Sequence, residues 1–534
     1  MRPCPEILMK MQFFDATATN CRYMNATLTR GYLYLIQRYS LNVCELYMQS
    51  FASDASIKKV VQSGHVIKTY YPIRRFRHED SWQWQITFAL RYEGVNIEVL
   101  KAFFDKIGSA EIERFILAHR LGAVQRRVWF LYEYLTGRSL NIQDGEGGSY
   151  TPLIDEAFQY ALPASSSVRV RRYHILNNLI GNKDFAPYVR KTAKVLEFSS
   201  DRLKAESEKL LKNYSPELLY RAVQYLYIKE TKSSFAIERE APDQRRMDAF
   251  VAILRGMSDT PLTKATLIAV QNSVVDARYR QTDWRSDQVY VGETLAPGIE
   301  KVHYVAPKPG AIASIMDGFI RCMEQWMAAR ECDSVVAAAV LGFAFVFLHP
   351  FDDGNGRIHR FLLHAILAQT GFSPHGLIFP VSAVMLKNQL DYDKALESFS
   401  SRLMSLLDYD IDDRGEVSVR NDSLDFYRAI DYTPIVEYFQ QVIVQTIRTE
   451  WKSELDYLKA YDKMREAMRN IVDMPDKKAN QFILFVRQNG GRLSQRKRQL
   501  FPELGDDEIV RLEAAIAEAG GGAETEDVME TIER

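Results

Sequence analysis

The 534-residue chain lacks several features that would place it in a common functional class. It contains no Gly-x-x-x-x-Gly-Lys-Ser/Thr loop and no His-Glu-x-x-His pair, which excludes P-loop nucleotide hydrolysis and zincin-type proteolysis. No internal repeat is present in the sequence, so a solenoid is excluded. No apolar stretch reaches the length that a membrane-spanning helix requires.

The chain also lacks a dominant charge and an organised set of cysteines. Its 68 Lys and Arg residues nearly balance its 69 Asp and Glu residues, and the net charge of −1 provides no general attraction to nucleic acid or acidic lipid. The five cysteines show no metal-binding or disulfide spacing, which is typical of a reducing compartment. The first residues lack the apolar core of a signal peptide. We therefore expect a cytoplasmic protein without a membrane segment.

The most informative segment is 349–360, which reads His-Pro-Phe-Asp-Asp-Gly-Asn-Gly-Arg-Ile-His-Arg. Gly354 and Gly356 permit a tight turn whose backbone N–H groups point into one anion-binding concavity. The apolar spacing that follows predicts a helix starting just after Gly356, and its positive N-terminus adds to the same field. Arg357 and Arg360 then share one helix face, where each can fork onto two phosphate oxygens.

Two further residues of this segment suit chemistry on a phosphate. The carboxylate of Asp353 lies at the mouth of the turn, and proteins usually hold magnesium by one or two carboxylates together with phosphates. His349 has an unperturbed pKa near 6.5 and can take a proton from an attacking hydroxyl. The apolar run 335–348 predicts a buried helix that ends at Pro350 and presents His349 to a cleft.

These twelve residues resemble, position for position, the Fic-family signature His-x-Phe-x-Asp-Gly-Asn-Gly-Arg-x-x-Arg. The family's usual activity is the transfer of AMP from ATP to a hydroxyl of a target protein. The resemblance implies a protein adenylyltransferase that needs ATP and Mg²⁺ and modifies Ser, Thr or Tyr, itself included. It also implies a role for each motif residue: His349 as the base, Phe351 as the core anchor, Asp353 as the magnesium ligand, Gly354, Asn355 and Gly356 as the phosphate cradle, and Arg357 and Arg360 as the clamp on the outer phosphates.

Two other segments extend the resemblance toward the nucleotide. Strand-like runs at 288–292 and 302–305 resemble the Fic flap, a β-hairpin that aligns the target segment by strand pairing and covers the nucleotide. The flap residues expected at the nucleotide are Val289, Tyr290, Val291 and Gly292. Tyr392 falls near the place where family members put a pair of tyrosines against the base, although the second position is Asp393 here.

Residues 231–240 resemble the inhibitory helix of the family, whose pattern is Ser/Thr-x-x-x-Glu-Gly/Asn. Ser234 and Glu238 match the pattern and share a helix face, whereas Arg239 stands where Gly or Asn is usual. The resemblance implies that Glu238 pairs with Arg360, so that ATP binds in a pose unfit for transfer. Family members with this arrangement can also remove AMP, using the glutamate to orient water.

The length predicts two to four domains, and the apolar fraction of 47% is sufficient for large buried cores. We expect a mainly α fold: an N-terminal helical domain at 1–215, a Fic core with its flap at 220–445, and a C-terminal helical module at 450–534. In the last part, an amphipathic helix at 477–486, a Gly turn and a basic helix at 494–498 are typical of helix-turn-helix or winged-helix modules. We favour a docking or packing role for this module, with DNA contact through 494–498 as the alternative.

Other functions stay open at this point. The motif could serve another nucleotide or phosphate-bearing donor, although the intact arginines and Gly356 favour a nucleoside triphosphate. A non-enzymatic protein that senses nucleotide through Arg360 and acts as a DNA-binding or scaffold protein is the second alternative. The sequence leaves the target protein and the oligomeric state open.

Overall fold

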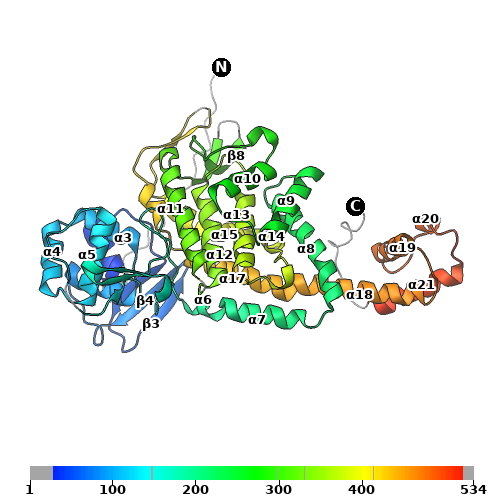
Figure 1. The fold of residues 1–534 in the computed structure, drawn as a ribbon, viewed down its shortest axis with the longest axis horizontal. Helices are drawn as coiled ribbons and strands as arrows, with labels where there is room; N and C mark the ends of the chain where they lie inside the picture. Colours follow the sequence, from blue (N-terminus) through cyan, green and yellow to red (C-terminus); the bar gives the residue numbers. More distant parts are fainter. Residues whose placement is uncertain (1–27, 146–147, 297–298, 330, 413, 521–534) are drawn as a thin grey trace, which may run out of the picture.

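The structure, a computed structural model, describes residues 28–145, 148–296, 299–329, 331–412 and 414–520. The predicted mainly helical fold class is confirmed, because helices form most of the described chain and the strands make only small sheets. Figure 1 shows an N-terminal part beside a central helical body, with the C-terminal helices extending away from the body on one long helix. No helix of the described residues combines the length and the apolar character needed to cross a membrane.

We expected an N-terminal part that is helical throughout, but it contains two small sheets as well as helices. The first has the order β1-β2-β4-β3 and the second the order β5-β7-β6. β2 alternates partly exposed and buried residues, and β4 is rich in β-branched and aromatic residues, features that favour strands. The elements are β1 (Thr29–Arg30), α1 (Gly31–Tyr39), β2 (Met48–Ser53), β3 (Lys59–Ser63), β4 (Val66–Pro72), α2 (Trp82–Tyr92), α3 (Ile97–Lys106), α4 (Ser109–Ala118), α5 (Ala123–Thr136), β5 (Thr151–Pro152), β6 (Val168–Val170) and β7 (Ile175–Asn177).

The central body follows and is built from helices around one large apolar core, with two short hairpins at its surface. Its elements are α6 (Ala193–Glu197), α7 (Ser200–Leu211), α8 (Pro216–Ile237), α9 (Gln244–Gly256), α10 (Lys264–Val274), β8 (Tyr290–Ala296), β9 (Ile299–Val305), α11 (Pro309–Ala328), α12 (Ser334–Leu348), α13 (Asn355–Gln369), α14 (Val381–Lys387), α15 (Gln389–Met404), β10 (Tyr409–Ile411), β11 (Val417–Val419), α16 (Leu424–Arg428) and α17 (Thr433–Gln445).

α12 runs through the centre of this body and packs against α11, α13 and α17. All but one of its residues are buried, so the buried helix predicted at 335–348 is present. It begins where Asp333 Oδ1 accepts a hydrogen bond from Val336 N at 3.0 Å. It ends at His349, whose φ of 47° is left-handed, and Pro350 prevents its continuation. α12 therefore fixes the position of His349.

The C-terminal part begins as a continuation of the core. α17 passes through a π-helical turn, Thr446–Trp451, into α18 (Lys452–Arg469). Trp451 is fully buried, donates from Nε1 to the Ile378 carbonyl at 3.0 Å and stacks on Phe379 with 4.4 Å between ring centroids. The helical path therefore crosses the boundary that we placed near residue 450, and the division of the chain at about 215 and 450 stays a prediction.

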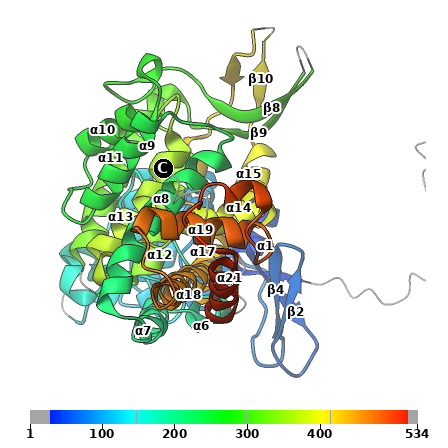
Figure 2. The same ribbon diagram turned by 90° about the vertical axis from the view of Figure 1, so that its right-hand side faces the viewer.

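Beyond α18, three helices pack on a small core of their own (Figure 2): α19 (Asp476–Gln488), α20 (Gln495–Arg498) and α21 (Asp506–Ala519). The described part of this module contains no strand and so no wing, because the residues after α20 carry the apolar spacing of one more helix. Within the basic segment, Arg498 pairs with Asp506, and Lys497 Nζ lies 3.7 Å from the centroid of the Phe485 ring.

We expect Trp451→Ala to lower the free energy of unfolding by roughly 3–5 kcal/mol, because it removes a fully buried indole and its hydrogen bond. The midpoint of urea unfolding, followed by circular dichroism, should fall accordingly. Leu500→Ala is the control, since Leu500 is 51% exposed and its loss should leave the midpoint unchanged. Equal midpoints for the two variants would contradict the continuity of α18 with the core.

Candidate active site

The predicted phosphate-binding turn lies between α12 and α13. Gly354 has a left-handed φ of 91° directly before the first turn of α13. Asn355 closes the turn, since its Oδ1 accepts from Phe351 N at 3.1 Å and its Nδ2 donates to the Phe351 carbonyl at 2.7 Å. The Phe351 ring is fully buried and lies 5.1 Å from the Trp284 ring. Phe351 thus packs in the core beneath the turn, as the sequence indicated.

His349 is held as a neutral imidazole with a defined tautomer. Its Nδ1 lies 3.0 Å from the Val346 carbonyl, and because a carbonyl only accepts, Nδ1 carries the hydrogen and Nε2 the lone pair. Although the residue is partly exposed, desolvation by the surrounding atoms and the positive charge of Arg285 lower the pKa of the ring to about 4. His349 can therefore accept a proton at Nε2 at pH 7.

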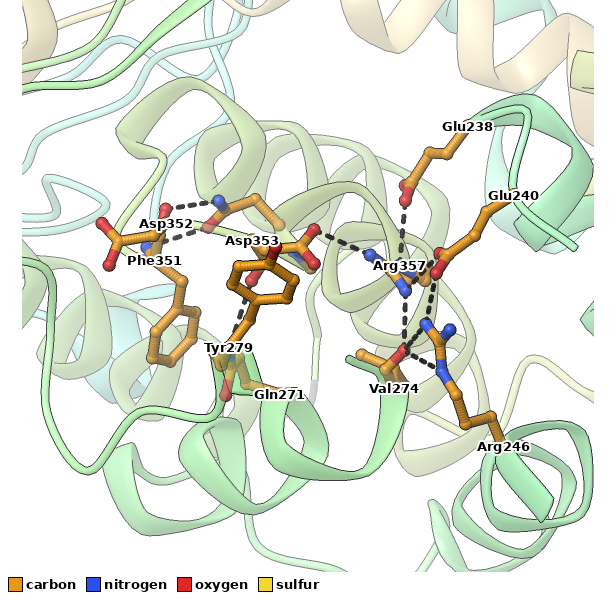
Figure 3. A network of polar contacts seen from close by, with 12 residues as sticks. Glu238, Glu240, Arg246, Gln271, Val274, Tyr279, Phe351, Asp352, Asp353 and Arg357 are labelled. Carbon is orange, nitrogen blue, oxygen red and sulfur yellow. Dashed lines mark hydrogen bonds and ion pairs between the residues drawn. The ribbon is translucent and has the colours of Figure 1, made fainter. Parts of the chain in front are cut away.

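Arg357, the first motif arginine, is surrounded by partners from this chain (Figure 3). Its side chain is 2% exposed and faces three carboxylates: Glu238 Oε2 at 2.9 Å from Nε, Glu240 Oε2 at 2.6 Å from Nη1, and Asp353 Oδ1 at 2.8 Å from Nη2. The contact between Arg357 Nε and Glu238 is an ion pair, but its geometry is not that of a hydrogen bond. Nη1 also donates to the Val274 carbonyl at 2.6 Å. An anionic ligand must displace a carboxylate to bind this guanidinium.

Arg360, the second motif arginine, is held by the end of α8, where we expected the helix at 231–240. Its Nη2 donates to Glu238 Oε1 at 2.6 Å and to the Ser234 carbonyl at 2.7 Å, and its Nε donates to Ser234 Oγ at 2.7 Å. The side chain is 1% exposed. The structure thus brings together the three residues that the sequence linked, and Glu238 spans both motif arginines.

The Glu238 carboxylate also covers the first turn of α13. A Cβ atom at Gly356 would lie 2.2 Å from Glu238 Oε1, so no other residue fits there unless Glu238 moves. The first N–H groups of a helix lack acceptors inside the helix, and together with the helix dipole they favour an anion. The carboxylate therefore lies where the positive end of α13 meets Arg357 and Arg360, a position that suits a phosphate.

Two residues of this network, Glu240 and Arg246, were not predicted from the sequence. Glu240 links Arg357 to Arg246: its Oε2 lies 2.6 Å from Arg357 Nη1, and its Oε1 lies 2.6 Å from Arg246 Nη2 (Figure 3). Arg246 Nη2 also donates at 2.6 Å to the Val274 carbonyl that Arg357 contacts. The acid two residues after Glu238 was visible in the sequence. Two helical residues that far apart point in different directions, however, so the contact requires the helix to end between them.

The chain leaves α8 in a Schellman motif, which supplies this reversal. Arg239 takes a left-handed φ of 56° directly after Glu238. Arg239 N donates to the Ala236 carbonyl at 2.9 Å, and Glu240 N donates to the Phe235 carbonyl at 3.2 Å. Gly and Asn adopt this conformation most easily, so Arg239 fills the position at a conformational cost. Among the described residues, Arg239 forms no ion pair with Glu238.

Asp353 has the properties that a magnesium ligand needs. Its side chain is 42% exposed, and Oδ1 makes its contacts within the chain, with Gly354 N at 2.6 Å and Arg357 Nη2 at 2.8 Å, which leaves Oδ2 for another ligand. The described residues contain no cluster of three or more His, Cys, Asp or Glu side chains that could hold a metal alone. Magnesium commonly uses one or two carboxylates and takes the rest of its shell from phosphates and water. The donor set therefore fits a metal that arrives with a phosphate ligand.

β8 and β9 form the hairpin predicted as the flap, paired antiparallel with a shift in register between Val291 and Gly292. Val289 and Tyr290 are partly buried at its root, whereas Val291 is 43% exposed. The outer edge of β8 has no partner strand among the described residues, and Figure 2 shows the hairpin projecting from the body. The loop residues 297–298 lie outside the described residues.

Tyr392 lies on α15 and is 5% exposed. Its ring is stacked with that of His359, with 6.4 Å between the centroids and 18° between the planes. Burial raises the pKa of its hydroxyl. The contact of Tyr392 with a nucleotide base stays a prediction.

Comparison with known proteins identifies a domain within this chain. The profile of the Fic/DOC family matches residues 261–367, which include the hairpin, the turn and both motif arginines. The chain contains a Fic/DOC domain. The resemblance that we inferred from 349–360 is thereby confirmed.

The relatives of this Fic domain match it over a short length. Protein adenylyltransferase Fic of Drosophila mojavensis is 35% identical over 95 residues, which is 17% of this chain and 16% of that protein. The protein of the same name from Aedes aegypti is 33% identical over 95 residues, with the same shares. The match thus spans about a sixth of these relatives.

Two solved structures are similar to larger parts of the chain. A Fic family protein from Desulfovibrio desulfuricans G20 is 20% identical, covers 58% of this chain and 87% of its own, and has a TM-score of 0.36. A Fic domain containing signaling protein from Bacteroides thetaiotaomicron VPI-5482 is 17% identical, covers 49% of this chain and 96% of its own, and has a TM-score of 0.34.

We expect Arg239→Gly to stabilise the end of α8, because glycine adopts the left-handed conformation without the roughly 1–2 kcal/mol that other residues incur. Hydrogen exchange of the amides of residues 239 and 240 should slow by about tenfold, since 1.4 kcal/mol corresponds to a factor of ten. Arg239→Ala is the matched control and should exchange like the wild type. If the two variants exchange alike, the Schellman motif is not under strain.

Proposed function

We propose that this chain is a protein adenylyltransferase that transfers AMP from ATP to a Ser, Thr or Tyr hydroxyl of a protein, and that Glu238 holds it inactive. The observation that carries the proposal is the position of the Glu238 carboxylate, which contacts Arg357 and Arg360 at the N-terminus of α13. The adenylyltransferase names of the insect relatives support the same reaction.

The charges around the turn give a reason why this arrangement opposes ATP. Three guanidinium groups face three carboxylates there: Arg246, Arg357 and Arg360 against Glu238, Glu240 and Asp353. The cluster is neutral as it stands, and a triphosphate would add several negative charges beside carboxylates that already neutralise the arginines. The outer phosphates can reach the arginines only when Glu238 and Glu240 release them. With both carboxylates in place, ATP must bind in another pose.

The transfer itself uses the groups around His349. The hydroxyl oxygen of the target attacks the α-phosphorus of ATP, its proton passes to Nε2 of His349, and the bond to pyrophosphate breaks. The hydrogen bond to Val346 keeps the other nitrogen protonated, so that Nε2 faces the reaction with its lone pair. Backbone N–H groups at the start of α13 offset the negative charge on the reacting phosphate.

Two further groups complete the proposed site. Asp353 would hold magnesium, whose charge, when the ion is bound, offsets that of the departing pyrophosphate. The free edge of β8 would pair with an extended segment of the target and so bring its hydroxyl toward His349. Recognition through backbone pairing makes few demands on side chains, which suits an enzyme that modifies itself as well as other proteins.

The alternatives use the same site differently. A Fic transferase with another phosphate-bearing donor would need the same arginines, and removal of AMP would use Glu238 to orient water at the same place. A nucleotide-sensing DNA-binding or scaffold protein gains no support, since Lys497 and Arg498 already contact Phe485 and Asp506.

We expect Glu238→Gly to raise AMP transfer, self-modification included, by more than about tenfold, because it removes the carboxylate that pairs with Arg360 and one of the three carboxylates on Arg357. Glu240 still contacts Arg357, so Glu238→Gly/Glu240→Gln should be faster than the single variant. The measurement is a labelling time course with ATP labelled at the α-phosphate, repeated with label at the γ-phosphate to detect phosphate transfer.

The matched control for this time course is Glu206→Gln, which removes a glutamate whose ion pair with Arg448 lies at the surface. It should label at the wild-type rate. A Glu238→Gly protein that labels no faster than this control would show that Glu238 does not hold the enzyme inactive. If the protein is labelled only by ATP that carries the label at the γ-phosphate, the reaction is phosphate transfer and not AMP transfer.

In the Glu238→Gly protein, His349→Ala should lower the rate of AMP transfer by roughly 10² to 10⁴, the usual loss for a general base, and leave the Kd of AMP nearly unchanged.

A base with a pKa of about 4 stays unprotonated from pH 8 to pH 6, so the rate of the Glu238→Gly protein, which retains His349, should be constant over this range. A rate that falls through an apparent pKa near 6.5 would contradict the lowered pKa.

A further inference from the structure

Arg285 is a buried cation outside the cluster that surrounds the motif arginines. It precedes β8, is 3% exposed, and among the described residues it forms no ion pair. Its N–H groups donate to four backbone carbonyls: Nε to His349 at 2.7 Å, Nη1 to Asp287 at 2.5 Å, Nη2 to Pro307 at 2.6 Å, and its backbone N to Pro350 at 2.8 Å.

A buried charge without a counter-ion is costly, so its position needs a physical reason. The end of α12 supplies one, because the last carbonyls of a helix lack partners within the helix and carry the negative end of its dipole. The Tyr304 hydroxyl donates to the Phe347 carbonyl, and Arg285 donates to the His349 carbonyl. Arg285 thus stabilises the end of the buried helix that carries the proposed base, and the helix end stabilises Arg285.

The same guanidinium contacts both sides of the root of the flap. Asp287 lies just before β8, and Pro307 lies just after β9. β9 is also tied down by Tyr304, which donates to a carbonyl of α12, and by its Val305 carbonyl, which accepts from the Tyr427 hydroxyl at 2.7 Å. The two strands therefore leave the body at one point, next to the end of α12.

We propose that Arg285 is a positioning residue that couples the flap to His349. It holds the His349 carbonyl in the left-handed bend and fixes both ends of the hairpin to it. A left-handed residue other than glycine persists where its surroundings impose it, and Arg285 binds the backbone at His349 and at Pro350. The inference rests on the proposed function: a target segment paired with β8 and the imidazole that takes its proton then belong to one rigid unit, which sets the distance between hydroxyl and Nε2.

The charge of Arg285 has a second effect on His349. The charged groups that face the imidazole are Arg285, Glu238 and Asp353; the carboxylates raise its pKa, whereas burial and Arg285 lower it. Burial lowers the pKa of Arg285 itself to about 10, with Asp287, Asp352, Tyr304 and Tyr427 facing it, so that it stays charged at pH 7. A neutral side chain at this position would therefore raise the pKa of His349, while burial, the larger cause of its low value, would remain.

The test places Arg285→Gln and Arg285→Lys in the full chain that carries Glu238→Gly, with α-labelled ATP as probe and self-modification as readout. Arg285→Gln should lower the rate at saturating ATP by about tenfold or more, because the base is misplaced, while the apparent KM for ATP stays within about twofold. The acid limb of its pH profile should move to higher pH. Arg285→Lys should recover part of the rate and keep the acid limb at low pH, since the charge remains.

Arg278→Gln is the matched control, because Arg278 is 79% exposed and pairs with Asp276 at the surface. It should change neither the rate nor the pH profile. A merely structural role of Arg285 would reduce the amount of folded enzyme without moving the pH profile of the remainder. A folded Arg285→Gln protein with the rate and the pH profile of the control would overturn the inference. If Arg285→Gln does not fold, a folded Arg285→Lys protein with the rate of the control would overturn it.

Hydrogen exchange gives an answer that does not depend on activity. The amides of β8 and β9 should exchange severalfold faster in Arg285→Lys, whereas those of α19 and α21 should not change. Unchanged exchange of the hairpin in the folded variant overturns the coupling. An inactive Glu238→Gly parent with faster exchange of the hairpin in Arg285→Lys would instead contradict the proposed function and leave the coupling supported.

Discussion

The pairing of Glu238 with Arg357 and Arg360 is the interaction on which the proposed regulation of this protein depends. Both arginines are buried, and burying a guanidinium is costly, so it needs acceptors or a counter-ion close by. In the described chain, glutamates of the segment that ends α8 meet this need. The same positive site can serve a phosphate, so whichever anion occupies it excludes the other.

The fold brings this about by joining three helix ends. α8 ends in a left-handed residue after Glu238, and α12 ends in a left-handed residue at His349; both ends meet the N-terminus of α13. Where a helix ends in a defined left-handed residue, the side chains at its end have a defined position. Glu238 is positioned in this way toward the motif arginines, and His349, we propose, toward the hydroxyl of the target. Glu240 gains its contact only because the chain reverses at Arg239.

Much of this could be predicted from the sequence, because it is carried by local patterns. The buried helix before His349, the turn, the start of α13 and the spacing of Ser234 from Glu238 are all encoded by neighbouring residues. The contacts of Glu240, Arg246 and Arg285 could not be predicted, since each joins segments far apart in the chain or depends on a backbone reversal. The strands of the N-terminal part were missed because short runs of apolar residues favour helix and strand alike.

We propose that Glu238 and Glu240 compete with the outer phosphates of ATP for the motif arginines. Calorimetric titration with ATP and with AMP measures this competition directly, because AMP lacks the outer phosphates. We expect that in Glu238→Gly/Glu240→Gln the affinity for ATP rises by at least about tenfold relative to that for AMP, which corresponds to about 1.4 kcal/mol. An unchanged ratio of the two affinities between this variant and the wild type would contradict it.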